Sequence, residues 1–277
     1  MKIYREFIDI AEGQAHFRHT PDSSGKKTPL ILIHMSPVAS GFLVPLMNAI
    51  GDEERRLIAP DTLGNGDSSP PTVANPQIID FADGLIQILD IINIKEAHFY
   101  GIRTGAMIAT EIAIKQPHRV KSLILDDLVI QSHSKSTGSI GEPCPKIDFH
   151  GSQINWAWHV IRDHFIWLPW WERSKENRII LDLPSAESLH TNTVELIKAI
   201  ETFHLSYNAA QAWPREERLP LIQVPTMIPY EPSHTAFPDT RPTAKIIKNS
   251  KTFNLPEGDT RFEAKGTIIN NWLNSEF

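Results

Sequence analysis

One stretch near the middle of the chain constrains the fold more than any other, residues 98–109 with the sequence HFYGIRTGAMIA. It begins with apolar, β-forming residues, continues with two glycines four positions apart, and ends with small and apolar residues of helical character. This order is typical of a buried strand, a tight turn and a helix. Arg103 stands midway between Gly101 and Gly105. We therefore expect the turn to lift the side chain of Arg103 above a sheet.

Apolar runs of strand length alternate with helical segments on either side of this turn. Such alternation implies right-handed crossovers and a mostly parallel sheet that helices cover on both faces. An alternating segment near the N-terminus predicts an antiparallel strand pair in front of this sheet. The expected elements are the strand pair at 6–18, strands at 29–34, 56–61 and 120–127, and a helix at 77–92.

The alternation of strands and helices stops after residue 127 and resumes near residue 221. The intervening part is first rich in Ser, Gly, Pro and Lys, then rich in tryptophan, and then helical. None of it resembles the repeating strand and helix of the preceding part. We expect a core domain of residues 1–129 and 216–277, interrupted by a helical cap at 130–215.

Composition excludes several classes of protein. The 277 residues carry a net charge of -6 without a long basic run, which argues against nucleic acid or an anionic membrane as a partner. Cys144 is the single cysteine, and the N-terminus lacks the apolar core of a signal peptide. We expect a cytoplasmic protein without membrane spans. No metal-ligand spacing, dinucleotide fingerprint or P-loop occurs, so we expect no metal and no cofactor.

Five stretches of the sequence together resemble the α/β-hydrolase superfamily, because they occur in the order and at the spacing typical of that superfamily. The resemblance implies a mostly parallel central sheet flanked by helices. The position of the cap is similar to that in the capped branch, which contains epoxide hydrolases, dehalogenases and carbon–carbon bond hydrolases. The five stretches are residues 32–34 with the following loop, 59–68, 101–105, 225–228 and 255–258.

In this superfamily the turn between the two glycines is the nucleophile elbow, and it carries a catalytic serine. Here that position holds Arg103, whose guanidinium stays protonated and cannot attack a substrate. The register of the family places the acid at His234 and the histidine at Asp259, so the two have exchanged places. We expect Arg103 to anchor an anion, and His234, Asp259 or a cap histidine to act as base. The alternative is a structural salt bridge between Arg103 and Asp259 in a dead site.

The resemblance also implies oxyanion donors. By position these are the backbone N–H groups of Met35 and Thr104, the second at the start of the elbow helix. Met35 stands where the superfamily usually has glycine, so its side chain narrows the approach of a substrate to these donors. Thr104 is also the only hydroxyl within the elbow, although as a nucleophile it is out of register by one position.

Four further side chains are candidates for substrate binding, and each has a structural alternative. His34 ends a buried strand and is also suited to packing there. Asp127 ends the strand after the elbow, where it could equally be a solvated residue. Trp156 and His159 share one side of a cap helix at a spacing of three, and such tryptophans also form cores.

Three functions follow from these residues. The first is a cofactor-free enzyme with hydrolytic or lyase chemistry on a small organic acid or carbonyl compound, with no covalent serine step. The second is a non-catalytic binder that keeps the pocket as a receptor. The third is a hydrolase with an unconventional nucleophile such as Thr104. A small-molecule partner, such as a carboxylate, is expected in the first two, and the resemblance to capped relatives allows a homodimer.

Overall fold

The computed structural model describes residues 1–22, 26–128, 130, 144–167, 169–179, 182–230, 239–255 and 261–275, apart from the side chain of Arg261. An eight-stranded sheet runs through it in the order β1-β2-β4-β3-β5-β6-β7-β8. β1, β2 and β4 pair antiparallel, and all other neighbours pair parallel, which confirms the expected mostly parallel sheet. The strands are β1 Tyr4–Ile10, β2 Gly13–His19, β3 Lys27–Ile33, β4 Arg55–Pro60, β5 Ala97–Ile102, β6 Val120–Asp126, β7 Thr226–Tyr230 and β8 Ser250–Asn254.

Helices cover both faces of this sheet. On one face α1 and α9 pack against alternate residues of the central strands, and on the other α2, α3 and α6 pack against the residues in between. This alternation explains why β3 reads as a continuous apolar run, because both of its faces are buried. The helices are α1 Val44–Ile50, α2 Ile78–Ile91, α3 Thr104–Lys115, α4 Ser152–Asp163, α5 Ala186–Lys198, α6 Phe203–Ala212, α7 Arg215–Arg218, α8 Arg241–Ile246 and α9 Arg261–Leu273.

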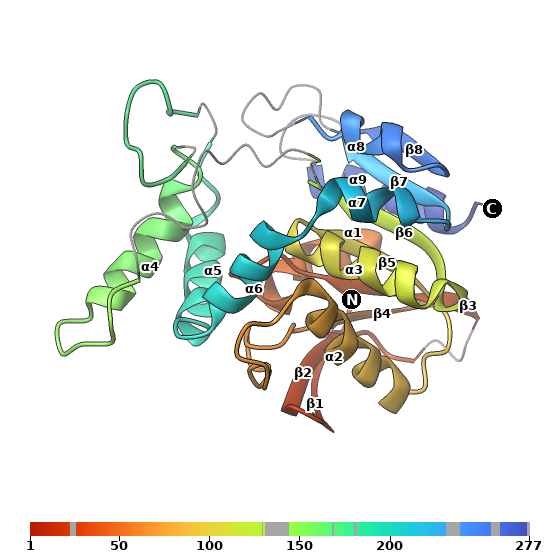
Figure 1. Cartoon of the computed structure of the whole chain (residues 1–277), viewed down its shortest axis with the longest axis horizontal. Helices are drawn as coiled ribbons and strands as arrows, with labels where there is room; N and C mark the ends of the chain where they lie inside the picture. The colour runs from red at the N-terminus through yellow and green to blue at the C-terminus, as the bar shows by residue number, and fades with distance from the viewer. Residues whose placement is uncertain are drawn as a thin grey trace.

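The helices α4, α5 and α6 lie between β6 and β7 in the chain. Figure 1 shows α4 and α5 to one side of the sheet, with α6 leading back to it. Trp156 of α4 packs near Trp170 and near Phe203 of α6, with ring centroids 6.1 and 5.8 Å apart. These rings belong to a separate hydrophobic cluster with its own buried residues. We call α4, α5 and α6 the helical insertion.

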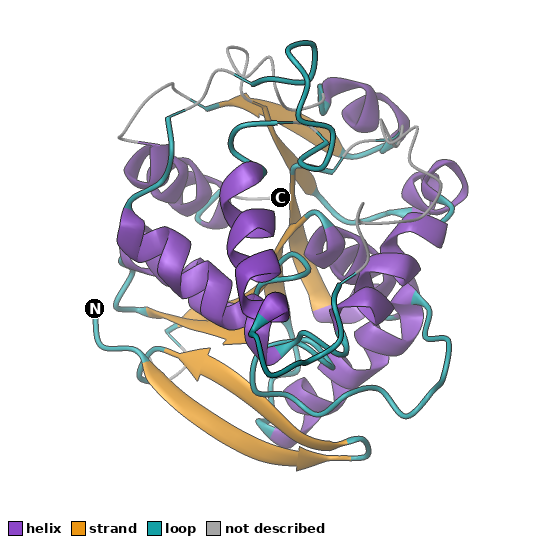
Figure 2. Cartoon of the chain, turned by 90° about the vertical axis from the view of Figure 1, so that its left-hand side faces the viewer, coloured by secondary structure: helices purple, strands orange, loops and turns teal. Residues whose placement is uncertain are grey.

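The β1–β2 hairpin forms one edge of the sheet, as Figure 2 shows near the N-terminus. Within the insertion α5 ends at Lys198, and a turn precedes α6, where Thr202 Oγ1 donates to the carbonyl of Gly64 at 2.5 Å. The strand and helix pattern was expected to return near residue 221, and β7 starts at Thr226. Within the described ranges, no helix is both long and apolar enough to cross a membrane.

Candidate active site

The turn between β5 and α3 is tight, and both of its glycines are required. A Cβ atom on Gly105 would overlap the carbonyl oxygens of Ile33 and His34, and one on Gly101 would overlap the backbone of Gly105. The start of α3 is therefore pressed against the end of β3. Arg103 occupies the turn with φ 49° and ψ −111°, a conformation that costs free energy for any residue other than glycine.

Arg103 forms an ion pair with Asp127, at 2.5 Å between Nε and Oδ2. The two residues come together because β5 and β6 are parallel neighbours, with Ile102 opposite Asp126, and because the Arg103 N–H donates to the Asp126 carbonyl. Asp127 also has a left-handed backbone, with φ 51°. Burial disfavours the charged guanidinium, but the ion pair with Asp127 outweighs this effect and raises the pKa of Arg103.

The helical insertion adds two groups within electrostatic range of Arg103, namely His164 and Tyr207. Burial lowers the pKa of His164 to about 4, and the charge of Arg103 acts in the same direction. His164 Nδ1 lies 2.7 Å from the carbonyl of Val160, which can only accept, so Nδ1 carries the proton and Nε2 holds the lone pair. Burial likewise raises the pKa of Tyr207. A cap histidine was among the expected bases, but no local pattern identified His164 or Tyr207, because both residues lie far from the elbow along the chain.

A second polar group lies at the same end of β6, on the face covered by α9. Asp126 Oδ2 accepts hydrogen bonds from Tyr100 at 2.6 Å and from Lys265 of α9 at 2.5 Å. All three side chains are buried. The carboxylates of these two consecutive residues thus make contacts on opposite faces of the sheet. Asp126 binds Lys265 of α9, and Asp127 binds Arg103.

The predicted triad members His234 and Asp259 lie outside the described residues. The carboxylate that the described residues place at Arg103 is that of Asp127, which the sequence had suggested for substrate binding. Thr104 begins α3, so its N–H is one of the helix N-terminal groups without an intrahelical acceptor. Met35 follows β3 at the same end of the sheet, because Ile33 pairs with Gly101 of β5.

The other candidates for substrate binding are engaged with their surroundings. His34 is buried, its Nδ1 donates to the carbonyl of Met35 at 2.9 Å, and its Nε2 accepts from Thr62 N–H at 2.9 Å. Because Nε2 accepts this hydrogen bond it carries no proton, and burial lowers the pKa of His34 in the same sense. Trp156 belongs to the core of the insertion.

His159 lies in an ionic cluster on α4. Its Nδ1 accepts from Arg162 at 3.1 Å and lies 3.6 Å from the buried carboxylate of Asp163, which also contacts Arg162 and Arg173. His159 and Asp163 are four positions apart and therefore lie on the same side of α4.

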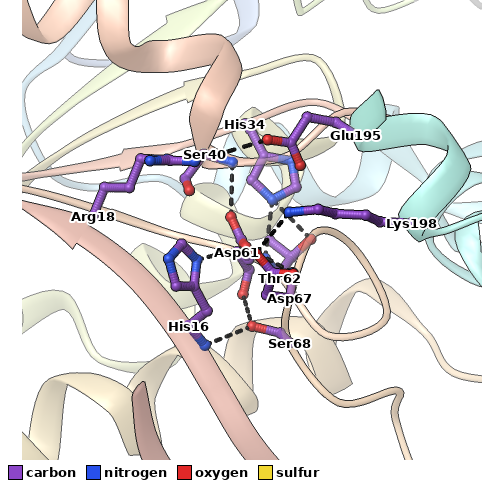
Figure 3. Close-up of polar contacts among 10 residues, drawn as sticks. All are labelled: His16, Arg18, His34, Ser40, Asp61, Thr62, Asp67, Ser68, Glu195 and Lys198. Carbon is purple, nitrogen blue, oxygen red and sulfur yellow. Dashed lines mark hydrogen bonds and ion pairs between the residues drawn. The ribbon is translucent and has the colours of Figure 1, made fainter. Parts of the chain in front are cut away.

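Another cluster, around Asp61, has ligand types suited to a metal ion. His16, Asp61 and Asp67 each offer one ligand atom, and these atoms lie within 4.8 Å of one another. However, Asp61 already accepts from the N–H groups of Ser40 at 2.8 Å and Asp67 at 3.0 Å, and its Oδ2 lies 2.7 Å from His16 Nδ1 (Figure 3). Asp67 in turn binds Lys198 at 2.7 Å. These bonds organise the loop after β4.

Comparison with known proteins gives partial matches in sequence and nearly complete ones in structure. The family described as alpha/beta hydrolase fold matches residues 28–139. Proline iminopeptidase of Heyndrickxia coagulans is 32% identical over 44% of this chain and 42% of the relative. 2-Hydroxymuconate semialdehyde hydrolase of Pseudomonas sp. (strain CF600) is 34% identical over 45% of this chain and 43% of the relative. The chain therefore matches less than half the length of these two relatives.

Solved structures match almost throughout. The enol-lactonase of Burkholderia xenovorans LB400 superposes with a TM-score of 0.71 and 15% identity over 98% of this chain and 100% of that one. The malate-bound esterase of Thermogutta terrifontis gives a TM-score of 0.72 and 18% identity over 98% of both chains. Identities this low establish the fold alone. The family match over residues 28–139 and the common architecture together show that this chain has the α/β-hydrolase fold.

Proposed function

We propose that this chain is an enzyme of α/β-hydrolase fold that acts on a small organic anion, holds that anion with Arg103 and lacks the serine nucleophile of the superfamily. The observation that carries the proposal is the strained backbone of Arg103 in the turn between β5 and α3. Strain of this kind persists where the surrounding structure enforces it, and it concentrates at functional sites. Arginine at the nucleophile position of the superfamily directs the chemistry away from acyl transfer through serine.

The surroundings of Arg103 suit an anion. The N-terminus of α3 begins directly after it, so the helix dipole and the N–H of Thr104 add to its positive charge. With Met35, Thr104 supplies the proposed oxyanion donors. A guanidinium binds a carboxylate through charge-assisted hydrogen bonds, which makes a small carboxylate the preferred ligand class.

Proton transfer requires a group with an available lone pair. We assign this role to the neutral Nε2 of His164, with His234 and Asp259 as the alternatives from the family register. In this arrangement the helical insertion acts as a cap that completes the site. The chemistry is then hydrolysis by an activated water or a lyase reaction, in which Arg103 stabilises the developing negative charge.

The test uses Arg103→Gln, with Arg5→Gln as the matched control on the exposed edge strand β1. Small carboxylate esters, lactones and hydroxy acids are incubated with each protein, and products are followed by NMR. We expect Arg103→Gln to lower turnover at least about 100-fold while Arg5→Gln leaves it unchanged. Equal turnover in the Arg103 variant and the wild type would refute the proposal. Labelling by a fluorophosphonate would instead support an unconventional nucleophile.

The ion pair with Asp127 favours a second candidate, a non-catalytic binder of small anions. Asp127 already neutralises Arg103, which suits reversible binding as well as catalysis. The two functions are distinguished by incubating the protein with a carboxylate for a long time and then recovering the bound compound. An unchanged ligand together with Arg103-dependent binding identifies a receptor, whereas a converted ligand identifies an enzyme.

A further inference from the structure

Two consecutive aspartates at the end of β6 make ion pairs of very different character. Asp126 pairs with Lys265, and the side chains are only 7% and 5% exposed. Asp127 pairs with Arg103, and these side chains are 19% and 39% exposed. Opening a buried pair leaves uncompensated charges in the interior, whereas water stabilises the partners of an exposed pair when they separate. Of the two, only the pair of Arg103 and Asp127 is suited to open during binding.

We propose that Asp127 is an internal counter-ion that occupies the place of the anionic ligand at Arg103, so that a ligand binds by displacing it. The inference rests on the proposed function, in which Arg103 is the anion anchor. The displacement exchanges one carboxylate for another at the same guanidinium, so the pairing energy that is lost is largely recovered. Asp127 thus lowers the apparent affinity for any anion.

The backbone supports this assignment. Among the described residues other than glycine, positive φ values occur at Asn93, Arg103 and Asp127, so two of these three form this ion pair. Their strained conformations hold both side chains at the ends of adjacent strands. The pair is therefore preorganised by the sheet, and a ligand meets a guanidinium whose position is already fixed.

The same arrangement defines the class of ligand. A displaced Asp127 carboxylate stays close by and repels further negative charge, and Asp126 adds to this negative potential at Arg103. A monocarboxylate introduces the least repulsion. We infer that the site prefers small monocarboxylates to dicarboxylates, and that removing the charge of Asp127 weakens this preference.

The experiment compares the binding of acetate and of malonate at fixed ionic strength. The proteins are the wild type, Asp127→Asn, Arg103→Gln, the double variant and Asp83→Asn, which removes an exposed carboxylate paired with Lys115 elsewhere. The readout in all proteins is the backbone amide resonance of Thr104 in ¹⁵N-labelled protein, together with the Nε–H resonance of Arg103 in the proteins that retain this residue, identified by its loss in Arg103→Gln. Circular dichroism verifies that each variant is folded.

We expect Asp127→Asn to bind acetate about three- to tenfold more tightly than the wild type, and malonate with a larger gain. Asp83→Asn should match the wild type, and the double variant should lose the gain. If the wild type binds through Arg103 as tightly as Asp127→Asn does, the counter-ion role is wrong while the proposed anion anchor stands. If neither folded protein binds either anion, the anion anchor itself is wrong.

Discussion

The chain holds two aspartates directly after parallel strands, Asp61 after β4 and Asp127 after β6, and their surroundings are opposite. Asp61 is 2% exposed, and both of its carboxylate oxygens accept hydrogen bonds from the loops and strand around it (Figure 3). Asp127 is partly exposed and makes an ion pair with one partly exposed arginine. Both oxygens of Asp61 are engaged within the fold, whereas we propose that Asp127 exchanges its partner for a ligand.

The difference teaches how to separate structure from function among charged residues. A buried carboxylate whose two oxygens both accept hydrogen bonds from the protein contributes to stability. A partly exposed pair contributes less to stability, and the strained backbone of Arg103 and Asp127 is consistent with the proposed anion-binding role. The following predictions test the contrast between the buried carboxylate of Asp61 and ion pairs that are more exposed to water.

The largest effect is expected for Asp61→Asn. The amide nitrogen of asparagine would face the donors that now bind Asp61, so we expect a loss of about 3 kcal/mol in the free energy of unfolding. Urea denaturation followed by circular dichroism measures it. Asp83→Asn is the matched control at an exposed pair and should cost less than about 0.5 kcal/mol. Equal effects for the two variants would contradict the distinction.

The second-largest effect is expected in the pH dependence of the free energy of unfolding. Burial would raise the pKa of Asp61, but the hydrogen bonds from His16 and from the Asp67 N–H oppose this effect and lower the pKa to about 2. The folded protein therefore binds this proton more weakly than the unfolded chain does. The resulting contribution, about 2 kcal/mol, is present above about pH 4 and is lost as the pH falls toward 2. Denaturation midpoints across this range should fall less steeply in Asp61→Asn than in the wild type.

The smallest effect is expected for Lys198→Gln. Lys198 of α5 binds Asp67 at 2.7 Å, and both side chains are about one-third exposed, at 34% and 35%. We expect a loss below about 0.5 kcal/mol, because water screens such a pair. High salt should remove even this difference from the wild type. A loss comparable to that of Asp61→Asn would mean that α5 is held to the core mainly by this contact.

Local patterns predicted much of the core. The apolar run at 29–34 corresponds to β3, the helical spacing at 77–92 to α2, and the glycine-flanked turn to the junction of β5 and α3. These predictions succeed because strand and helix periodicity and the demand for glycine are properties of a few consecutive residues. The same turn identified Arg103 as the central side chain.

The sequence by itself determined the fold class, the turn and the presence of an arginine in it, since each depends on neighbouring residues. Tertiary structure alone decided which groups meet that arginine. The pairing of β5 with β6 brings Asp127 to it, and the packing of the insertion brings His164 and Tyr207 within electrostatic range. Such contacts join residues that are distant along the chain, and they depend on packing that no local pattern encodes.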